Sequence, residues 1–246
     1  MDDFIKKLSN ILSLIVVFVF SAVFYFNYKG FVYENGKIEL RKQEALAVER
    51  NDIAVVLPKT VVVNASQKYS LGNKNAPLTM FEYSSLGCPH CADFHLDVVP
   101  DLIEEYVNKG LLRIVFVHFP LDKNSMKAAM ISKCLAYEDF MPFIHDMFSS
   151  QRSWWMSNDE EQLFKHAAEH GLSYDETQAC IKNNKIAQEI VADRQEAIDR
   201  LKMQGTPAFF ITGSDGNEII YGSTNYRHIA KYLNSRLKRL GIDIQQ

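Results

Sequence analysis

The sequence predicts an α/β fold with an inserted all-helical domain. A helical pattern over residues 91–108 lies between two apolar strand-like segments, 78–84 and 111–119. This order is typical of parallel strands joined by a right-handed crossover helix. After about eighty helical residues, strand-like segments 208–212 and 219–221 flank a Gly-containing turn, which predicts a hairpin.

Composition places the chain among globular proteins. It has 246 residues, of which 47% are hydrophobic and 23% charged, a balance that excludes disorder and a disulfide-dense mini-protein. The formal net charge of -3 excludes nucleic-acid attraction through the field of the whole protein.

The first thirty residues predict a membrane anchor or a signal peptide. Residues 11–26 are almost wholly apolar, and residues 8–28 are long enough to cross a bilayer. We find no clean small-residue cleavage site, which favours an uncleaved anchor, with a cleaved signal as the alternative. Either reading predicts export to a compartment where disulfides persist, such as the periplasm.

Composition shifts divide the rest of the chain. Residues 31–67 predict a stalk or linker, with helix formers over 38–50 and an extended stretch over 53–63. The alternative is an oligomerisation segment. Residues 68–123 and 204–246 predict one α/β domain, and residues 124–203 predict the helical insertion.

Start and stop signals place the helices of the insertion and of the C-terminus. Ser173 with Glu176 forms a capping-box pattern, and Pro100 predicts a kink in the crossover helix. The expected helices begin at Asn124 or Ser125 and run to 137, span 139–149, begin at Asn158 or Asp159 and stop at 171, follow Ser173, span 184–203, and span 226–240.

The motif Gly87-Cys88-Pro89-His90-Cys91 opens the crossover helix. Cysteines three apart on a first helical turn share a face, so both sulfurs can reach one bond. Pro89 suits a first turn, where its missing N–H would be unpaired anyway. Free N–H groups and the helix dipole favour a Cys88 thiolate, and His90 can add to this stabilisation.

A stabilised Cys88 thiolate predicts a disulfide that is readily donated. Whatever favours the thiolate favours the dithiol over the disulfide, so the Cys88–Cys91 disulfide becomes more oxidising. A zinc knuckle is the alternative, with His95 and His118 as further ligands. It is disfavoured because no second cysteine pair is present.

The order of these motifs resembles the DsbA family of thioredoxin-fold proteins. The resemblance rests on strand, Cys-Pro-His-Cys, helix, strand, helical insertion and then Gly205-Thr206-Pro207-Ala208-Phe209-Phe210 before the hairpin, over residues 69–240. It implies a thioredoxin-like core, a redox-active cysteine pair, and neither a metal nor an organic cofactor.

The resemblance also implies roles for other residues. Pro207 matches the cis-proline of the family and Thr206 the residue before it, in a substrate-binding loop that faces the cysteines. Glu82 matches a family acid beneath the site, where a buried carboxylate would exchange a proton with Cys91. It could instead be an exposed strand residue.

The helical insertion carries further candidates. Cys134 and Cys180 resemble the second, structural disulfide of one family subgroup, with two free thiols as the alternative. His166 and His170 are four apart on a helix, but with no third ligand nearby we expect surface residues and no metal. Residues 154–156, Trp-Trp-Met, predict core or interdomain packing, or part of a hydrophobic groove.

Together these features predict an exported thiol:disulfide oxidoreductase that donates the Cys88–Cys91 disulfide to reduced secreted proteins. The resemblance implies reoxidation by a quinone-linked membrane partner of the DsbB type. A disulfide isomerase or reductase, oligomerised through the stalk, is the first alternative. A metal-binding Cys-x-x-Cys module is the second.

Overall fold

The structure is a computed structural model that describes residues 31–34, 37–40, 54–58, 61, 63, 69–156 and 160–243. The chain divides into two compact units, Met1–Val48 and Glu49–Gln246. The expected anchor over residues 8–28 lies outside the described residues. Among the helices that are described, none combines the length and the apolar composition that crossing a membrane needs.

The first unit contains an antiparallel hairpin of β1 (Phe31–Glu34) and β2 (Lys37–Leu40). The start of the helix expected over 38–50 is therefore wrong, because Lys37–Leu40 is a strand. Helix propensity is a weak signal over four residues that pair with a neighbouring strand.

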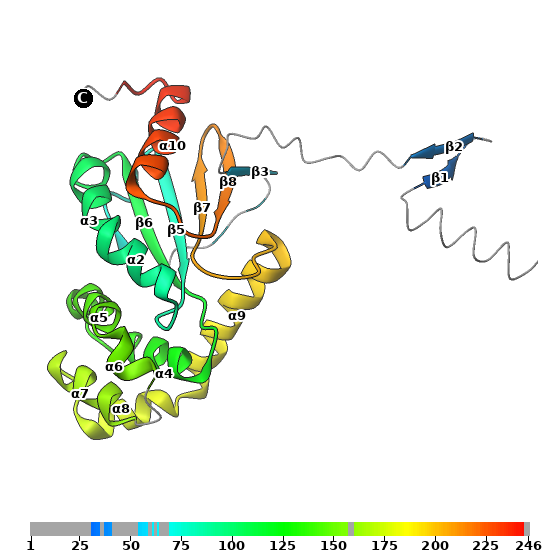
Figure 1. The fold of residues 1–246 in the computed structure, drawn as a ribbon. Helices are drawn as coiled ribbons and strands as arrows, with labels where there is room; N and C mark the ends of the chain where they lie inside the picture. The colour runs from blue at the N-terminus through cyan, green and yellow to red at the C-terminus, as the bar shows by residue number, and fades with distance from the viewer. Residues whose placement is uncertain are drawn as a thin grey trace, which may run out of the picture. The chain divides into compact units, whose positions relative to one another are not determined.

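The second unit is built on a six-stranded sheet with the strand order β3-β8-β7-β5-β6-β4 (Figure 1). Only β5 and β6 are parallel among the described pairs, with Leu78 opposite Leu112 and Ser84 opposite His118. The strands are β3 (Ala54–Leu57), β4 (Ser70–Leu71), β5 (Leu78–Ser84), β6 (Leu112–His118), β7 (Ala208–Gly213) and β8 (Gly216–Tyr221).

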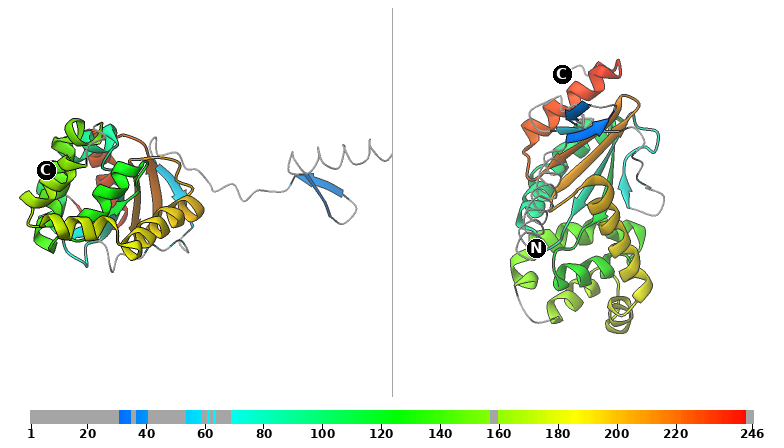
Figure 2. Two further views of the ribbon diagram at one scale, coloured as in Figure 1. Left: turned by 90° about the horizontal axis from the view of Figure 1, so that it is seen from below. Right: turned by 90° about the vertical axis from the view of Figure 1, so that its right-hand side faces the viewer.

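Helices cover both faces of the sheet, and a group of helices lies at the end of the sheet where β5 and β6 finish (Figures 1 and 2). Met80 of β5 packs with the crossover helix and the C-terminal helix, whereas Phe81 and Tyr83 pack on the opposite face with the long helix α9. The helices of the sheet domain are α2 (Pro89–Asp97), α3 (Val99–Leu102), the π-helical turn η1 (Ile103–Val107) and α10 (Tyr226–Arg239).

The inserted helices are packed around their own core of aromatic and aliphatic side chains, which also receives Cys91 and Ala92 from α2. The capping box of Ser173 and Glu176 at α8 is confirmed. These helices are α4 (Lys123–Ser132), α5 (Tyr137–Ser149), α6 (Gln151–Trp155), α7 (Glu161–Glu169), α8 (Tyr174–Ile181) and α9 (Asn184–Leu201).

The structure corrects several expected boundaries. Strand β3 lies within the stretch expected to be a stalk, because it pairs with β8 and extends the sheet. The cap of α4 is Asp122, whose carboxylate accepts the backbone N–H of Ser125, rather than Asn124 or Ser125. Helix α4 ends at Ser132 instead of residue 137. Helix α6 was not expected, and the caps proposed at residues 158 and 159 lie outside the described residues.

Candidate active site

Cys88 lies at the N-cap of α2, between β5 and the first helical turn. Its backbone is extended, with φ −87° and ψ 118°, and Pro89 occupies the first turn. The carbonyl oxygen of Cys88 accepts the backbone N–H groups of Cys91 and Ala92, each at 3.1 Å. The Cys88 side chain therefore projects beside the free N–H groups at the helix start, as the motif predicts.

The surroundings of Cys88 favour its thiolate. A hydrogen bond from the Cys91 thiol, then one from Thr206, then the backbone N–H groups of Cys91 and His90 lower the pKa of Cys88 to about 5 against the opposing effect of burial. The Cys88 residue is 7% exposed, so it is largely shielded from solvent. A thiolate with such a pKa is ionised at neutral pH.

Cys91 has the opposite character. It is fully buried beneath Cys88, and burial raises the pKa of its thiol, as does the neighbouring Cys88. Both cysteines are in the free thiol state in the structure. Cys88 is 7% exposed and Cys91 is 0% exposed, so the pair is an asymmetric dithiol in which Cys88 is the sulfur nearer to solvent.

The loop before β7 faces Cys88. The Thr206–Pro207 peptide bond is cis, and Cys88 Sγ lies 3.4 Å from the backbone carbonyl oxygen of Thr206, to which the protonated thiol donates. A cavity of about 410 Å³ adjoins this loop and is lined by Lys202, Gln204, Gly205, Thr206, Pro207, Tyr221 and Gly222. The structure thus brings Gly205, Thr206 and Pro207 together with Cys88.

Glu82 is buried in the sheet, so its alternative reading as an exposed strand residue is wrong. It is 1% exposed, and burial raises the pKa of its carboxyl group to about 8. Glu82 and Ser84 alternate onto the same face of β5, about 7 Å apart along the strand. Ser84 lies near enough to Cys91 to affect the pKa of that thiol. Glu82 is the preceding residue on the same face of β5, two positions earlier in the chain.

His90 is exposed, and its Nδ1 lies 3.7 Å from the carboxylate of Asp93. The effect of His90 on the pKa of Cys88 comes from its backbone N–H. A tuning role for its imidazole stays a prediction.

The structure reveals a contact with the motif that the sequence did not suggest. Gln151, at the start of α6, is buried and donates from Nε2 to the carbonyl oxygens of Leu86 at 2.7 Å and Cys88 at 3.1 Å. The two segments are more than sixty residues apart, with no local pattern to connect them.

Gly87 is the second unrecognised element. A Cβ atom at Gly87 would lie 2.4 Å from Ser125 Oγ and 2.5 Å from Trp155 Nε1. The motif loop is therefore packed directly against α4 and α6, and only glycine fits at this position. Trp155 is held there by its own hydrogen bond to Asp122 Oδ2 at 3.0 Å.

The remaining candidate residues, two cysteines and two histidines, have structural roles. Cys134 and Cys180 form a disulfide with a Cα–Cα distance of 6.4 Å. His95 is buried against Phe148, and His118 Nε2 is hydrogen bonded with Ser132 Oγ at 2.7 Å, as structural rather than knuckle residues.

Two further expectations can be compared with the structure. His166 is 8% exposed, so the expectation that it is a surface residue is wrong: its ring packs between α5 and α7 beside Asp146. Of the aromatic motif at 154–156, Trp154 is core and Trp155 packs between domains, whereas Met156 is 74% exposed.

The fold and site define a class of protein, a thioredoxin-fold dithiol protein with a helical insertion. The family model described as Thioredoxin matches residues 64–234. The crystal structure of Wolbachia pipientis alpha-DsbA1 is 32% identical, with a TM-score of 0.66, and the match covers 72% of this chain and 94% of that one. The chain belongs to the thioredoxin family and, within it, to the DsbA-type thiol:disulfide oxidoreductases.

Two further comparisons show how far the similarity extends. BdbD from Bacillus subtilis, in its oxidised form, shares the fold with a TM-score of 0.62 and 20% identity, over 71% of this chain and 95% of that one. A Rickettsia bellii protein, named for protein-disulfide oxidoreductase activity, is 28% identical over 145 residues, 58% of this chain and 56% of its own. The chain thus spans about half the length of the curated Rickettsia relatives it matches.

Proposed function

We propose that the protein is an exported thiol:disulfide oxidoreductase that donates its Cys88–Cys91 disulfide to reduced proteins. The observation that carries this proposal is the asymmetry of the two thiols, with the pKa of Cys88 lowered to about 5 and that of the buried Cys91 raised. A dithiol whose outer member is stabilised as a thiolate favours the reduced form, so its disulfide oxidises other thiols.

The exchange has two balanced steps. A substrate thiolate attacks Cys88 Sγ, the Cys88–Cys91 bond breaks, and Cys91 leaves and takes up a proton, which gives a mixed disulfide. A second substrate thiolate then attacks the substrate sulfur of that bond, and Cys88 leaves as a stabilised thiolate. The substrate loses two electrons and the protein gains them.

Glu82 supplies and accepts the proton that Cys91 needs. A carboxyl group with a pKa near 8 is mostly protonated at neutral pH, so it can protonate the departing Cys91 sulfur and recover the proton when the pair is reoxidised. Ser84 shares a face of β5 with Glu82 and is near enough to both Glu82 and Cys91 to lower the pKa of each, so its hydroxyl can relay the proton.

The substrate binds along the loop of Thr206 and Pro207. This loop lies against Cys88 Sγ, and the adjoining cavity is bounded by Gly205 and by Tyr221, which is 44% exposed. An extended, unfolded segment could pair with the loop backbone and rest its side chains on Tyr221. Unfolded or reduced exported proteins are the substrates that such a surface suits.

Export and reoxidation complete the proposal. The apolar stretch 8–28 and the Cys134–Cys180 disulfide both support an oxidising compartment, with the chain tethered to the inner membrane or released after cleavage. The redox-active cysteines serve as the only redox group of the reaction, and a DsbB-like quinone-linked membrane partner restores the disulfide.

The test is the reduction potential of the Cys88–Cys91 couple in the full chain, by equilibration with glutathione. We expect a value nearer the roughly −120 mV of DsbA than the roughly −270 mV of thioredoxin. A value near that of thioredoxin contradicts disulfide donation and makes reduction or isomerisation the better reading. A Cys88→Ser variant, which has no couple, is the control.

A further inference from the structure

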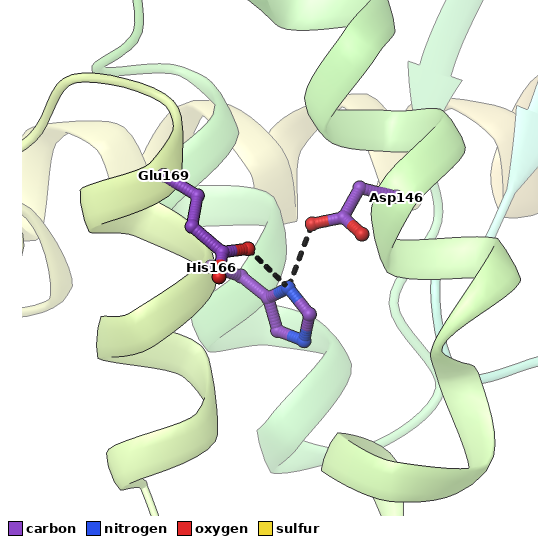
Figure 3. Close-up of side chains that lie close together, drawn as sticks. All are labelled: Asp146, His166 and Glu169. Carbon is purple, nitrogen blue, oxygen red and sulfur yellow. Dashed lines mark hydrogen bonds and ion pairs between the residues drawn. The ribbon is translucent and has the colours of Figure 1, made fainter.

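Four polar side chains of the helical domain converge between α5 and α7, away from the cysteine pair. We call them the α5–α7 cluster: Asp146 from α5, His166 and Glu169 from α7, and His170 directly after α7 (Figure 3 shows the first three). His166 Nδ1 lies 2.7 Å from Asp146 Oδ2 and 3.6 Å from Glu169 Oε2. His170 Nε2 lies 3.5 Å from the same Asp146 oxygen.

The hydrogen bonds of Ser150 favour one tautomer of His166. The hydroxyl of Ser150 donates its single hydrogen to the backbone carbonyl of Asp146 at 2.7 Å. With its hydrogen placed there, the Ser150 oxygen accepts from His166 Nε2, 3.2 Å away, and this assignment puts a hydrogen on Nε2. The other nitrogen, Nδ1, points at the two carboxylates, and in a neutral ring it carries a lone pair (Figure 3).

A lone pair aimed at carboxylate oxygens is unfavourable unless a cation lies between them. This cation is either a second proton on the ring or a metal ion. Histidine metal ligands ordinarily donate their other ring N–H to a neighbouring acceptor, which fixes the tautomer. Ser150 supplies that acceptor here.

The spacing of the ligand atoms fits a small transition-metal ion. In a tetrahedral zinc site with bonds of about 2.0–2.1 Å, neighbouring ligand atoms are about 3.4 Å apart. The ligand atoms of Asp146, His166 and Glu169 all lie within 4.8 Å of one another. The separation of 3.6 Å between His166 and Glu169 matches the tetrahedral value, and the 2.7 Å between His166 and Asp146 needs a shift of less than 1 Å.

The histidines of the cluster are more buried than its carboxylates, an arrangement that suits the binding of an ion. The side chains of His166 and His170 are 10% and 16% exposed, and the His170 ring is held edge-on against Phe143 at 5.5 Å. The carboxylates of Asp146 and Glu169 are 32% and 51% exposed, so an ion can reach the cluster from their side. The imidazoles are thus oriented in advance and the carboxylates can adjust.

We propose that the α5–α7 cluster binds one divalent transition-metal ion of the zinc class, with Asp146, His166 and Glu169 as ligands and His170 as an ion-pairing neighbour of Asp146. Imidazole with carboxylate is a donor set that suits Zn²⁺, whereas Ca²⁺ and Mg²⁺ prefer oxygen ligands alone. The site joins α5 to α7. The sequence missed it because Asp146 reaches the histidines only through helix packing.

The test is calorimetric titration of the untagged full chain with Zn²⁺, and with Mg²⁺ for comparison. The chain is kept oxidised at Cys88 and Cys91, because reduced thiolates would bind zinc themselves. We expect one equivalent of Zn²⁺ to bind with a micromolar or tighter Kd and to raise the Tm. Mg²⁺ should neither bind nor change the Tm.

Three variants separate the ligands from their surroundings. Glu169→Gln keeps the size of an exposed side chain and is expected to raise the Kd for Zn²⁺ at least tenfold. His166→Gln should abolish binding, whereas Glu161→Gln, an exposed change at the start of the same helix, should leave the Kd unchanged. Circular dichroism checks that each variant folds.

Two results would overturn the proposal. One is the lack of saturable Zn²⁺ binding in the oxidised wild-type chain, which would leave His166 as a protonated partner of the carboxylates. The other is an equal Kd in wild type and Glu169→Gln, which would place the bound ion elsewhere. Neither result bears on disulfide donation by Cys88 and Cys91.

Discussion

Replacing Cys91 by alanine should raise the pKa of Cys88. The largest contribution to the low pKa of Cys88 is the hydrogen bond from the Cys91 thiol. A hydrogen bond to a charged group contributes about 1.5–3 kcal/mol, and one pKa unit corresponds to about 1.4 kcal/mol. Losing this donor should therefore move the pKa of Cys88 from about 5 to about 6–7.

The titration is read from the ultraviolet absorbance of the thiolate and from the rate of alkylation as a function of pH. A Cys91→Ser variant is the matched control, since serine keeps an O–H donor in a side chain of similar size. We expect its Cys88 pKa to lie between those of the wild type and Cys91→Ala. A Cys88→Ala variant should show no thiolate step in the acid range.

The same shift has a consequence for stability. The pKa of Cys88 is lower in the folded chain than in the unfolded one, so its thiolate stabilises the reduced protein at high pH, and this contribution is lost as pH falls through about 5. The loss begins near the unfolded pKa of about 9 in both proteins, and in Cys91→Ala it should be complete one to two pH units higher than in the wild type, so the total contribution is smaller. If Cys88 titrates at the same pH in the wild type, Cys91→Ala and Cys91→Ser, the Cys91 thiol does not stabilise the Cys88 thiolate, and the reasoning fails.

Three further outcomes are expected in urea or thermal unfolding. In the oxidised protein, the raised pKa of Glu82 contributes stability that is present below about pH 4.5 and is lost as pH rises through about 8. The unfolding free energy of the wild type should therefore fall by about 3 kcal/mol between pH 4.5 and 7, and Glu82→Gln should remove this fall. An unchanged pH profile in Glu82→Gln would contradict burial of this carboxyl group. Gly87→Ala should cost about 1–3 kcal/mol by overpacking, while Gly205→Ala, where a Cβ meets nothing within 4 Å, should cost little. Replacing Cys134 and Cys180 together by alanine should lower the unfolding free energy by up to about 4 kcal/mol for a loop of 46 residues, and an effect below 1 kcal/mol would argue against an intact bridge.

Local signals in the sequence were sufficient for the elements whose cause is local. The capping box of Ser173 and Glu176 and the strand 78–84 depend on residues within one turn or one strand, and both match the structure. The motif at Cys88 depends in the same way on a helix start that its own residues define. The resemblance added Pro207, whose approach to the site no local pattern specifies.

What could not be predicted depends on distant packing. The residues of β3 indicated an extended stretch, but its place in the sheet depends on pairing with β8, which comes much later in the chain. The partner of His166 is Asp146, twenty residues earlier on another helix, so spacing within α7 alone indicated a surface residue. Burial of His166 follows from how α5 and α7 cross, which the sequence pattern leaves open.

The contacts of Gln151 link the inserted helices to the reactive thiol. The carbonyl oxygen of Cys88 accepts Gln151 Nε2 from one side and the first N–H groups of α2 from the other. The residue before Gln151 is Ser150, which receives the hydrogen bond of His166. Because Gln151 is buried, swinging the helical domain away from the sheet would leave the Leu86 carbonyl without this donor, at a cost of about 1–3 kcal/mol, while the Cys88 carbonyl would keep only the N–H groups of α2. The helical domain therefore helps to hold the backbone that carries the Cys88 thiolate, and its position relative to the sheet and the geometry of the thiolate are set together.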